Sequence, residues 1–490
     1  MNSRIRRLAI GLLVCYAVLF VQLNIVQIGR SHTMQTDTRN TRQVLRDFNH
    51  FRGPILTSDE VVIADSKPIT GSDFDYQREY PQGPLFADVT GYYSYTFGAT
   101  QLEKTQNDVL SGRTTDQQIG GLGDIFDKNA TTAGQVVTTL DSRLQALARD
   151  LLAGREGSIV ALDTRTGAVL AMYSEPTFDP NQVAVHDSAE AGKVLEWLNA
   201  LPGKPLLANA YQERYMPGST FKMITTAGAL DDGVISLESS WADETSYLPP
   251  QTTDPIENYG GHVCGGDLVE VFRRSCNTPF ARIAIDMGAE RMVNAADRFG
   301  VNEAVPFDLP RPAPSYFGQV GDFTDNLPLL AIRGFGQNED ALTPLHMALV
   351  AAGIANGGVM MQPHVVKETR SSDGGVLSRT KPEAWHTAMS PATSEIMTQL
   401  MINVVNDGTA SCCFKMTTPV QAAAKTGTAQ LNKQGEPQRS HAWIAAFAPA
   451  GDPADPPRVA VAVMLKGVND EISAGTGGKL AGPLAAQMLD

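Results

Sequence analysis

The sequence has few cysteines, and they do not form a metal-binding pattern. Its 490 residues include 5 Cys and 8 His, with no C-x-x-C pair and no H-E-x-x-H run, so we expect no metal site. Internal repeats and long low-complexity tracts are also lacking, which argues against a repeat architecture. With 42% hydrophobic and 19% charged residues, the composition is that of an ordinary globular protein.

Positive charge is in deficit, with 39 Lys and Arg against 53 Asp and Glu and a formal net charge of -14. Binding to nucleic acid requires a basic face, so we expect no nucleic-acid partner. The acidic balance otherwise indicates only solubility. The length of the chain predicts two or three domains.

The cysteines fall into two groups. Cys15 lies in an apolar stretch near the N-terminus, and the others are Cys264, Cys276, Cys412 and Cys413. If this part of the chain lies outside the cytoplasm, disulfides are plausible, and four cysteines allow three full pairings. The sequence does not choose among them, although closeness in the chain favours Cys264 with Cys276.

One long hydrophobic run, residues 8–28, contains no charged side chain. At 1.5 Å per residue, a run of this length crosses a bilayer core of about 30 Å. Arg4, Arg6 and Arg7 precede it, which predicts that residues 1–7 are cytoplasmic and that the rest of the chain lies outside. A cleaved signal peptide is the alternative. The long apolar run and the lack of a clear A-x-A site favour an uncleaved transmembrane anchor in the plasma membrane.

Residues 29–140 are polar and punctuated by Gly and Pro. They contain a possible strand at Val61–Ala64 and a helix-like run at Gln101–Leu110, but no nucleophile, base or metal spacing. We interpret this stretch as a non-catalytic spacer, pedestal or docking domain. A helix expected at Asp141–Leu152 leads into a second domain, residues 141–490.

Hydrophobic periodicity in the second domain predicts strands near both of its ends and helices between them. The strands are expected at Ser158–Leu162, Ala168–Tyr173, Ala422–Gln430, His441–Phe447 and Val459–Leu465, and the helices at Ser219–Leu230, Leu268–Phe280, Thr343–Asn356, Ser394–Val405 and Gly482–Asp490. This order predicts an α+β domain with one antiparallel sheet, in which the last strands pair with the first hairpin.

An S-x-x-K motif at Ser219–Lys222 follows the turn residues Pro217 and Gly218 and opens a predicted helix. Helix positions i and i+3 share a face, so the serine hydroxyl and the lysine amine can meet. A serine is a weak nucleophile until a base takes its proton, and a lysine is such a base only where its environment lowers its pKa. The competing explanation is a simple N-cap at Ser219.

A second S-x-x-K, Ser378–Lys381, shows that the motif alone is weak. It follows a Ser-, Asp- and Gly-rich run and precedes a proline, which predicts a polar hairpin or loop. Ser275-Cys276-Asn277 and Lys425-Thr426-Gly427-Thr428 add the missing context, because they follow Ser219 in a fixed order. The set S-x-x-K, S-x-N and K-T-G resembles that of penicillin-binding proteins and class A β-lactamases.

Further segments carry the same resemblance through residues 141–490. They are Tyr215–Lys222, Lys425–Gln430, His441–Pro449, and Gly334–Gln337 followed by Leu342–Ala348. The glycine pattern departs from the family at Phe335 and Gln337, so no role is carried onto either residue. Weaker similarities at Arg52–Ile55 and Thr100–Glu103 are typical of class B N-terminal domains. The layout as a whole resembles the penicillin-binding protein A type of actinobacteria.

The resemblance implies a catalytic role for five side chains. Ser219 would attack the carbonyl of a terminal D-alanyl-D-alanine bond, and Lys222 would take its proton. Ser275 would pass a proton toward the leaving amine, because a hydroxyl can donate and accept at once. Asn277 would hold Lys222 and the substrate amide. Lys425 would help to keep Lys222 neutral and would attract the substrate carboxylate.

The K-T-G strand is expected to bind the substrate. The hydroxyls of Thr426 and Thr428 would bind its carboxylate, and Gly427 would let its backbone lie close to the strand. The backbone N–H groups of Ser219 and Thr428 would form the oxyanion hole. Taken singly, Thr426, Thr428 and Asn277 each have an equally good structural explanation.

The implied fold is a five-stranded antiparallel sheet flanked by helices, with a smaller N-terminal domain and one transmembrane helix. The implied function is a peptidoglycan D,D-transpeptidase that cross-links stem peptides, is trapped by β-lactams, and uses no metal or organic cofactor. Membrane attachment is expected, and cell-division or cell-wall synthesis proteins are candidate partners.

Two alternatives remain open from the sequence. A D,D-carboxypeptidase or a β-lactamase on the same fold would transfer the acyl group to water. A non-catalytic division scaffold or β-lactam sensor would keep the fold without the reaction, although three intact motifs argue against lost chemistry. A bifunctional class A enzyme is disfavoured, because residues 29–140 are too short for a glycosyltransferase.

Overall fold

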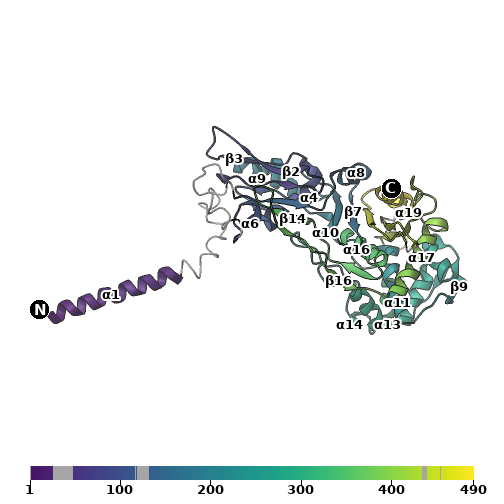
Figure 1. The fold of residues 1–490 in the computed structure, drawn as a ribbon. Coiled ribbons are helices and arrows are strands. Elements are labelled where there is room, and N and C mark those ends of the chain that lie inside the picture. The colour runs from purple at the N-terminus through teal and green to yellow at the C-terminus, as the bar shows by residue number, and fades with distance from the viewer. Residues whose placement is uncertain (1, 26–47, 116, 118–131, 433–438, 453) are drawn as a thin grey trace.

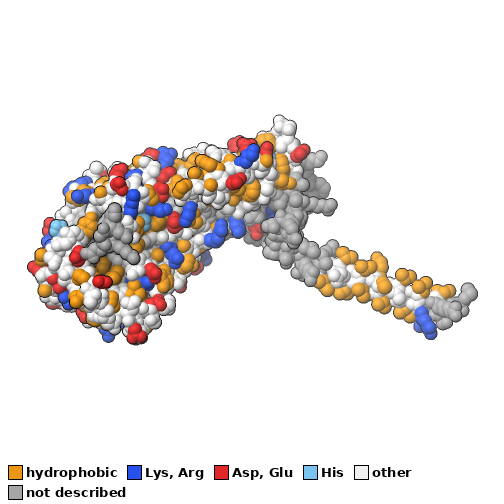
Figure 2. Space-filling view, turned by 180° about the vertical axis from the view of Figure 1, so that it is seen from behind, with side chains coloured by type: hydrophobic (Ala, Val, Ile, Leu, Met, Phe, Trp, Pro, Cys, Tyr) orange, Lys and Arg blue, Asp and Glu red, His pale blue; other side chains and the backbone are white. Residues whose placement is uncertain are grey.

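The computed structural model describes residues 2–25, 48–115, 117, 132–432, 439–452 and 454–490 (Figure 1). Helix α1 (Asn2–Asn24) contains one segment, Ile5–Asn24, that is long and apolar enough to cross a membrane, and none of it is buried in the protein. Hydrophobic side chains run along this helix, with basic ones near its far end (Figure 2). Residues 26–28 of the expected anchor lie outside the described residues.

The main sheet matches the predicted strands. It is formed by β7 (Gly157–Asp163), β8 (Val169–Glu175), β17 (Ala423–Gln430), β18 (Ser440–Ala448) and β19 (Val459–Leu465). Their order is β17-β18-β19-β7-β8, and every pair is antiparallel. The last strands therefore pair with the first hairpin, as expected. This order leaves β17, which carries the K-T-G motif, as an edge strand.

Helices cover the sheet and complete its core. α16 (Pro344–Ala355) packs on β7, β18 and β19, while α8 (Ser142–Leu152) and α20 (Gly482–Leu489) contact each other and pack on β8 and β19. The sheet strands are buried because apolar residues face both helical layers. Thr343 caps α16 through a hydrogen bond from the His346 backbone N–H. α17 (Pro391–Asp407) begins earlier than expected, because Ser390 is its N-cap.

The helix predicted over Leu268–Phe280 is wrong. Two helices, α12 (Leu268–Arg273) and α13 (Thr278–Arg298), replace it, with a tight turn between them. Ser275 has a φ of +61°, which a right-handed helix does not allow. Cys276 in the same turn forms a disulfide with Cys264, which confirms the pairing favoured by their closeness in the chain. A second disulfide joins the neighbours Cys412 and Cys413.

A second sheet combines segments from both halves of the chain. Its strands are β1 (Ile55–Leu56), β2 (Val62–Pro68), β3 (Tyr76–Glu79), β6 (Gln135–Thr138), β14 (Val366–Arg370) and β15 (Val376–Arg379), in the order β15-β14-β6-β1-β2-β3. The hairpin β14–β15 contains Ser378, whose hydroxyl is hydrogen-bonded to that of Thr369. The second S-x-x-K therefore lies in a hairpin, which agrees with the predicted hairpin or loop, but its membership of this sheet was not predicted.

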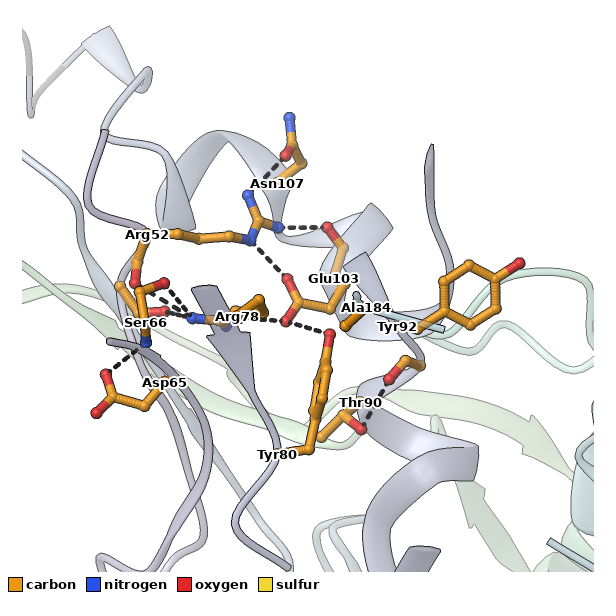
Figure 3. A network of polar contacts seen from close by, with 12 residues as sticks. Arg52, Asp65, Ser66, Arg78, Tyr80, Thr90, Tyr92, Glu103, Asn107 and Ala184 are labelled. Carbon is orange, nitrogen blue, oxygen red and sulfur yellow. Dashed lines mark hydrogen bonds and ion pairs between the residues drawn. The ribbon is translucent and has the colours of Figure 1, made fainter. Parts of the chain in front are cut away.

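The helix-like run expected at Gln101–Leu110 forms two short helices, α5 (Gln101–Thr105) and α6 (Asn107–Leu110). Glu103 on α5 is fully buried between two arginines (Figure 3). Its carboxylate receives Arg52 Nε at 2.6 Å and Arg78 Nε at 2.7 Å, and the Tyr80 hydroxyl at 3.1 Å. The weak N-terminal similarities at Arg52 and Glu103 thus correspond to a buried ion network that holds β3 and α5 together.

Candidate active site

Ser219 lies in a short 3₁₀ helix, η5 (Gly218–Phe221), and Lys222 opens the α-helix that follows, α11 (Lys222–Asp231). Side chains three residues apart eclipse in a 3₁₀ helix, so this turn aligns the serine with the lysine more closely than an α-helix does. The N-caps of the two helices are Pro217 and Phe221. Ser219 is therefore not an N-cap, and the simple structural explanation does not apply.

The amine of Lys222 is buried and makes specific contacts. Its Nζ donates to the Ser275 main-chain oxygen at 2.8 Å and to Asn277 Oδ1 at 2.9 Å, and lies 3.4 Å from Ser275 Oγ. The rings of Phe280 and Phe335 have their centroids 5.1 and 5.8 Å from Nζ. The site thus surrounds one lysine with three oxygens and two aromatic rings, and none of these groups is a carboxylate.

A second buried lysine completes the cluster. Lys425 Nζ donates to Ser275 Oγ at 2.8 Å and to the Thr426 main-chain oxygen at 3.0 Å. Burial lowers the pKa of Lys425 to about 7. Burial also lowers the pKa of Lys222 well below its ordinary value, and the nearby charge of Lys425 lowers it further. Of the two amines, Lys222 is therefore the one favoured in the neutral form at pH 7.

The turn that carries Ser275 and Asn277 is held in place by hydrogen bonds to the preceding segment. Asn258 Oδ1 accepts from the backbone N–H of Asn277 at 2.7 Å and of Thr278 at 3.1 Å. Asn277 Nδ2 in turn donates to the Glu257 main-chain oxygen at 3.0 Å. Asn258 was not predicted from the sequence, and no local signal marks it. Its role depends on a contact between two segments that only the fold brings together.

Two glycines allow β17 to lie against the Ser219 turn. A Cβ on Gly427 would be 2.7 Å from the Pro217 oxygen, and a Cβ on Gly218 would be 2.7 Å from the Thr428 oxygen. Gly218 also has a φ of +55°, which favours glycine. Gly427 thus has a packing reason of its own, on the side of the strand that faces the turn. Its contact with substrate stays a prediction.

Thr428 presents its backbone toward the Ser219 turn. Its main-chain oxygen accepts from Gln337 Nε2 at 3.3 Å, so this carbonyl points away from β18. In an antiparallel strand, the N–H and C=O of one residue point the same way. The N–H of Thr428 therefore also faces outward. Gly336, beside Gln337, accepts from the Gly218 N–H at 2.8 Å. The sequence hinted at this segment, but its role was not predicted.

The two threonine hydroxyls of β17 have protein partners. Thr426 Oγ1 is hydrogen-bonded to Thr409 Oγ1, and Thr428 Oγ1 accepts from the Gly477 N–H at 3.4 Å. Thr409 follows α17 and was not predicted to be part of the site. The structure therefore gathers Ser219 and the residues of all three motifs at the edge of the main sheet.

Comparison with known proteins gives the family. The model of the penicillin-binding protein transpeptidase domain matches residues 157–490, and that of the penicillin-binding protein A dimerisation domain matches residues 52–136. The chain belongs to the penicillin-binding protein transpeptidases. Its layout is that of class B, with a dimerisation-type domain before the transpeptidase domain, as the sequence motifs predicted.

The relatives of this penicillin-binding protein agree over nearly its whole length. The peptidoglycan D,D-transpeptidase PbpA of Mycolicibacterium smegmatis is 35% identical, across 99% of this chain and 97% of that protein. A crystal structure of penicillin-binding protein A from Mycobacterium tuberculosis is 34% identical, with a TM-score of 0.81, and covers 90% of this chain and 99% of that one. Its penicillin G acyl-enzyme complex has a TM-score of 0.80 at 34% identity, over 90% and 98% of the chains.

Proposed function

We propose that this penicillin-binding protein is a peptidoglycan D,D-transpeptidase that acts through an acyl-enzyme on Ser219. The serine attacks the carbonyl of a terminal D-Ala-D-Ala bond, D-alanine leaves, and an amine of a neighbouring stem peptide takes the acyl group. The names of its relatives and the β-lactam acyl-enzyme of the mycobacterial protein support this assignment. β-Lactams are expected to mimic the substrate and to acylate the same serine.

The observation that carries the proposal is the environment of Lys222. A neutral amine has two N–H groups and one lone pair. Its two shortest contacts, with the Ser275 main-chain oxygen and Asn277 Oδ1, use the two N–H groups, and the hydroxyl of Ser275 lies farther away at 3.4 Å. In our proposal the lone pair then takes the proton of Ser219. Because burial lowers the pKa of Lys222, its amine can act as a base at neutral pH without a carboxylate beside it.

Ser275 is placed to move a proton between the reacting groups. Its Oγ lies 2.8 Å from Lys425 Nζ and 3.4 Å from Lys222 Nζ. In our proposal, this hydroxyl donates to the leaving amine while it recovers a proton from the lysine side. Lys425 attracts the carboxylate of the departing D-alanine, and Thr426 and Thr428 donate hydrogen bonds to it.

The oxyanion that forms on the attacked carbonyl needs donors already in place. We assign this role to the backbone N–H groups of Ser219 and Thr428. The outward orientation of Thr428 and its close approach to Gly218 support the assignment. Asn277 holds the substrate amide as well as Lys222, and Gly427 lets the substrate backbone approach β17. The reaction then uses only groups of this chain.

The anchor and the N-terminal part fit a cell-wall role. We propose that residues 1–7 are cytoplasmic, that residues 8–28 form a single-pass anchor, and that the catalytic domain, residues 141–490, lies outside the plasma membrane. Residues 29–140 form a non-catalytic pedestal or dimerisation domain. Cell-division and cell-wall synthesis proteins are the candidate partners.

The experiment is turnover of a pentapeptide ending in D-Ala-D-Ala by the full chain in detergent, with and without an amine-bearing stem peptide. The proposal expects D-alanine release together with a cross-linked dimer, both lost in Ser219→Ala. D-alanine release without any dimer would identify a carboxypeptidase. Rapid hydrolysis of penicillin would identify a β-lactamase. If the protein neither turns over the peptide nor hydrolyses penicillin, the scaffold or sensor alternative would remain.

A further inference from the structure

Arg333, the last residue of α15 (Leu327–Arg333), is a buried cation outside the catalytic cluster. Its side chain is only 2% exposed. Its Nη1 donates to the Phe317 main-chain oxygen, and its Nη2 donates to Glu339 Oε2 at 2.8 Å. A guanidinium keeps its charge inside a protein, and burial of that charge costs free energy unless it is paired and hydrogen-bonded. An apolar side chain would fill the same space at lower cost, so the charge of Arg333 needs a further explanation.

The surroundings of Arg333 fit a planar cation. The rings of Tyr316 and Phe323 each have their centroid 5.4 Å from Cζ of Arg333, a distance at which an aromatic ring attracts a cation. Gly318 leaves the space for the guanidinium, because a Cβ at this position would lie 2.8 Å from Nη1 of Arg333. The rings and the glycine therefore hold the guanidinium in one orientation, in which it reaches the residues that follow α15.

Two acids lie beside the guanidinium, just beyond a short loop, residues 334–338, that begins directly after Arg333. Glu339 makes the hydrogen-bonded ion pair, and Asp340 Oδ1 lies 3.9 Å from Arg333 Nε. Burial raises the pKa of Asp340, and the charge of Arg333 opposes that rise. Glu339, whose side chain is 72% exposed, is thus the acid that binds the guanidinium directly. Arg333 therefore closes the base of the loop by joining the residues on its two sides.

The tip of this loop contacts both backbones that we assign to the oxyanion hole. The Gly336 oxygen accepts from the Gly218 N–H at 2.8 Å, and Gln337 Nε2 donates to the Thr428 oxygen at 3.3 Å. The loop is neither helix nor strand, and the φ angles of Gly336 and Asn338 are +81° and +71°. A residue other than glycine keeps a positive φ only where its surroundings fix it. The conformation of the tip therefore depends on the contacts that close the loop at its base.

We propose that Arg333 is a positioning residue for the oxyanion hole: with Glu339 it closes the base of the loop at residues 334–338, whose tip holds the two oxyanion-hole backbones together. The inference rests on the proposed acyl-enzyme function and adds a residue that acts on the reaction only through this loop. Its effect belongs to the step in which the oxyanion forms, and not to the noncovalent binding that precedes this step.

The test separates binding of penicillin G from acylation by it. Stopped-flow acylation of the full chain in detergent, at penicillin concentrations that saturate the rate, gives the dissociation constant of the noncovalent complex and the limiting rate constant. We expect Glu339→Gln to lower the limiting rate constant about threefold and Arg333→Met about tenfold, with an unchanged dissociation constant. Arg333→Lys should recover part of the rate. Glu290→Gln, at an exposed position on α13, is the matched control.

A second measurement tests whether Arg333 acts through the tip of the loop. The variant Gln337→Met already lacks the hydrogen bond from the tip to Thr428. Adding Glu339→Gln to this variant should therefore slow acylation by less than Glu339→Gln does in the wild type. Because Glu339 is exposed, this substitution leaves the buried packing intact and keeps the test valid even if Arg333→Met fails to fold.

The outcomes distinguish this inference from the proposed function. A wild-type limiting rate constant in Glu339→Gln, or a change confined to the dissociation constant, overturns the positioning role while the acyl-enzyme mechanism stands. A smaller amount of adduct that forms at the wild-type rate would identify a purely structural role and also overturns it, as do fully additive losses in the double variant. If the wild type forms no adduct with penicillin, the proposed function fails and the inference with it.

Discussion

Gln337 Nε2 lies 3.3 Å from the main-chain oxygen of Thr428, while the neighbouring Gly336 oxygen accepts from the Gly218 N–H at 2.8 Å. One short segment therefore holds both the edge strand β17 and the turn that carries Ser219. In the proposed mechanism, these two backbones supply the oxyanion hole. The side chain of Gln337 reaches the backbone of Thr428 rather than the nucleophile or the base, so it is a positioning residue.

Gln337→Met should slow acylation by penicillin about tenfold, because it keeps the volume of the side chain but loses the donor. The effect is smaller than the ~10²–10³ that follows removal of an oxyanion donor itself. The free energy of unfolding should fall by only about 1 kcal/mol. Stopped-flow acylation and thermal unfolding check both values, with exposed Gln399→Met as the control. Equal acylation rates in the two variants would show that Gln337 does not position the oxyanion hole.

The Cys264–Cys276 disulfide should matter for both stability and reactivity. It closes a short loop, for which about 3 kcal/mol of stabilisation is expected, and it tethers the turn in which Ser275 has a positive φ. The double variant Cys264→Ser/Cys276→Ser should unfold at a lower temperature and acylate more slowly where it is still folded. Acylation at the wild-type rate would show that the turn does not need the tether.

The Cys412–Cys413 disulfide provides the control for that experiment. It joins adjacent residues and closes almost no loop, so it removes little entropy from the unfolded chain. Cys412→Ser/Cys413→Ser should therefore retain nearly the wild-type unfolding temperature. A similar loss in both double variants would point to a general effect of removing cysteines.

Acylation should depend on pH through the two buried lysines. It rises with pH as Lys222 loses its proton, and it falls as pH passes about 7, where Lys425 loses the charge that attracts the substrate carboxylate. Lys425→Arg keeps a charge across this range and should abolish the descending limb, at a lower maximum rate. Acylation rates measured between pH 5 and pH 10 test this. A limb that persists in the variant would assign it to another group.

The buried network around Glu103 should stabilise the N-terminal part without acting in the reaction. Glu103→Gln leaves Arg52 and Arg78 without their carboxylate, and breaking a buried pair costs about 3–5 kcal/mol. Asp65→Asn, which breaks the exposed pair with Lys67, should cost far less, because solvent screens that pair. Denaturant unfolding measures both. Equal losses of unfolding free energy in the two variants would show that burial does not determine how much the network stabilises the protein.

The same network predicts a dependence on acid. Burial raises the pKa of Glu103, but the charges of Arg78 and Arg52 outweigh burial and hold it below the ordinary 4.5. A carboxyl with a lowered pKa in the folded state stabilises fully above its unfolded pKa, and this contribution is lost as pH falls below it. The stability difference between wild type and Glu103→Gln should therefore shrink below about pH 4.

Local patterns allowed much of this fold to be predicted. The five strands alternate or run apolar over short stretches, and the spacing of Ser219 and Lys222 is fixed within one turn. The break at Ser275 could not be predicted, because its positive φ depends on the partners of the turn, a disulfide and Asn258. Thr409 was missed for the same reason, since its contact with Thr426 joins separate elements.

The second sheet shows the same limit on a larger scale. β14 and β15 have ordinary hairpin patterns, and nothing in their residues indicates that β14 pairs with β6 from the N-terminal part. Long-range pairing is decided by packing after the local elements form, so a division of the chain by composition places these strands with their sequence neighbours.

The most direct test of the account is the intact mass of the full chain in detergent, followed over time with penicillin G. Wild-type protein should gain the mass of one penicillin and keep it for many minutes. Ser219→Ala should gain nothing, while Ser378→Ala, in the second S-x-x-K, should react like wild type. An adduct on Ser219→Ala, or none on the wild type, would contradict the assignment of Ser219 as the nucleophile.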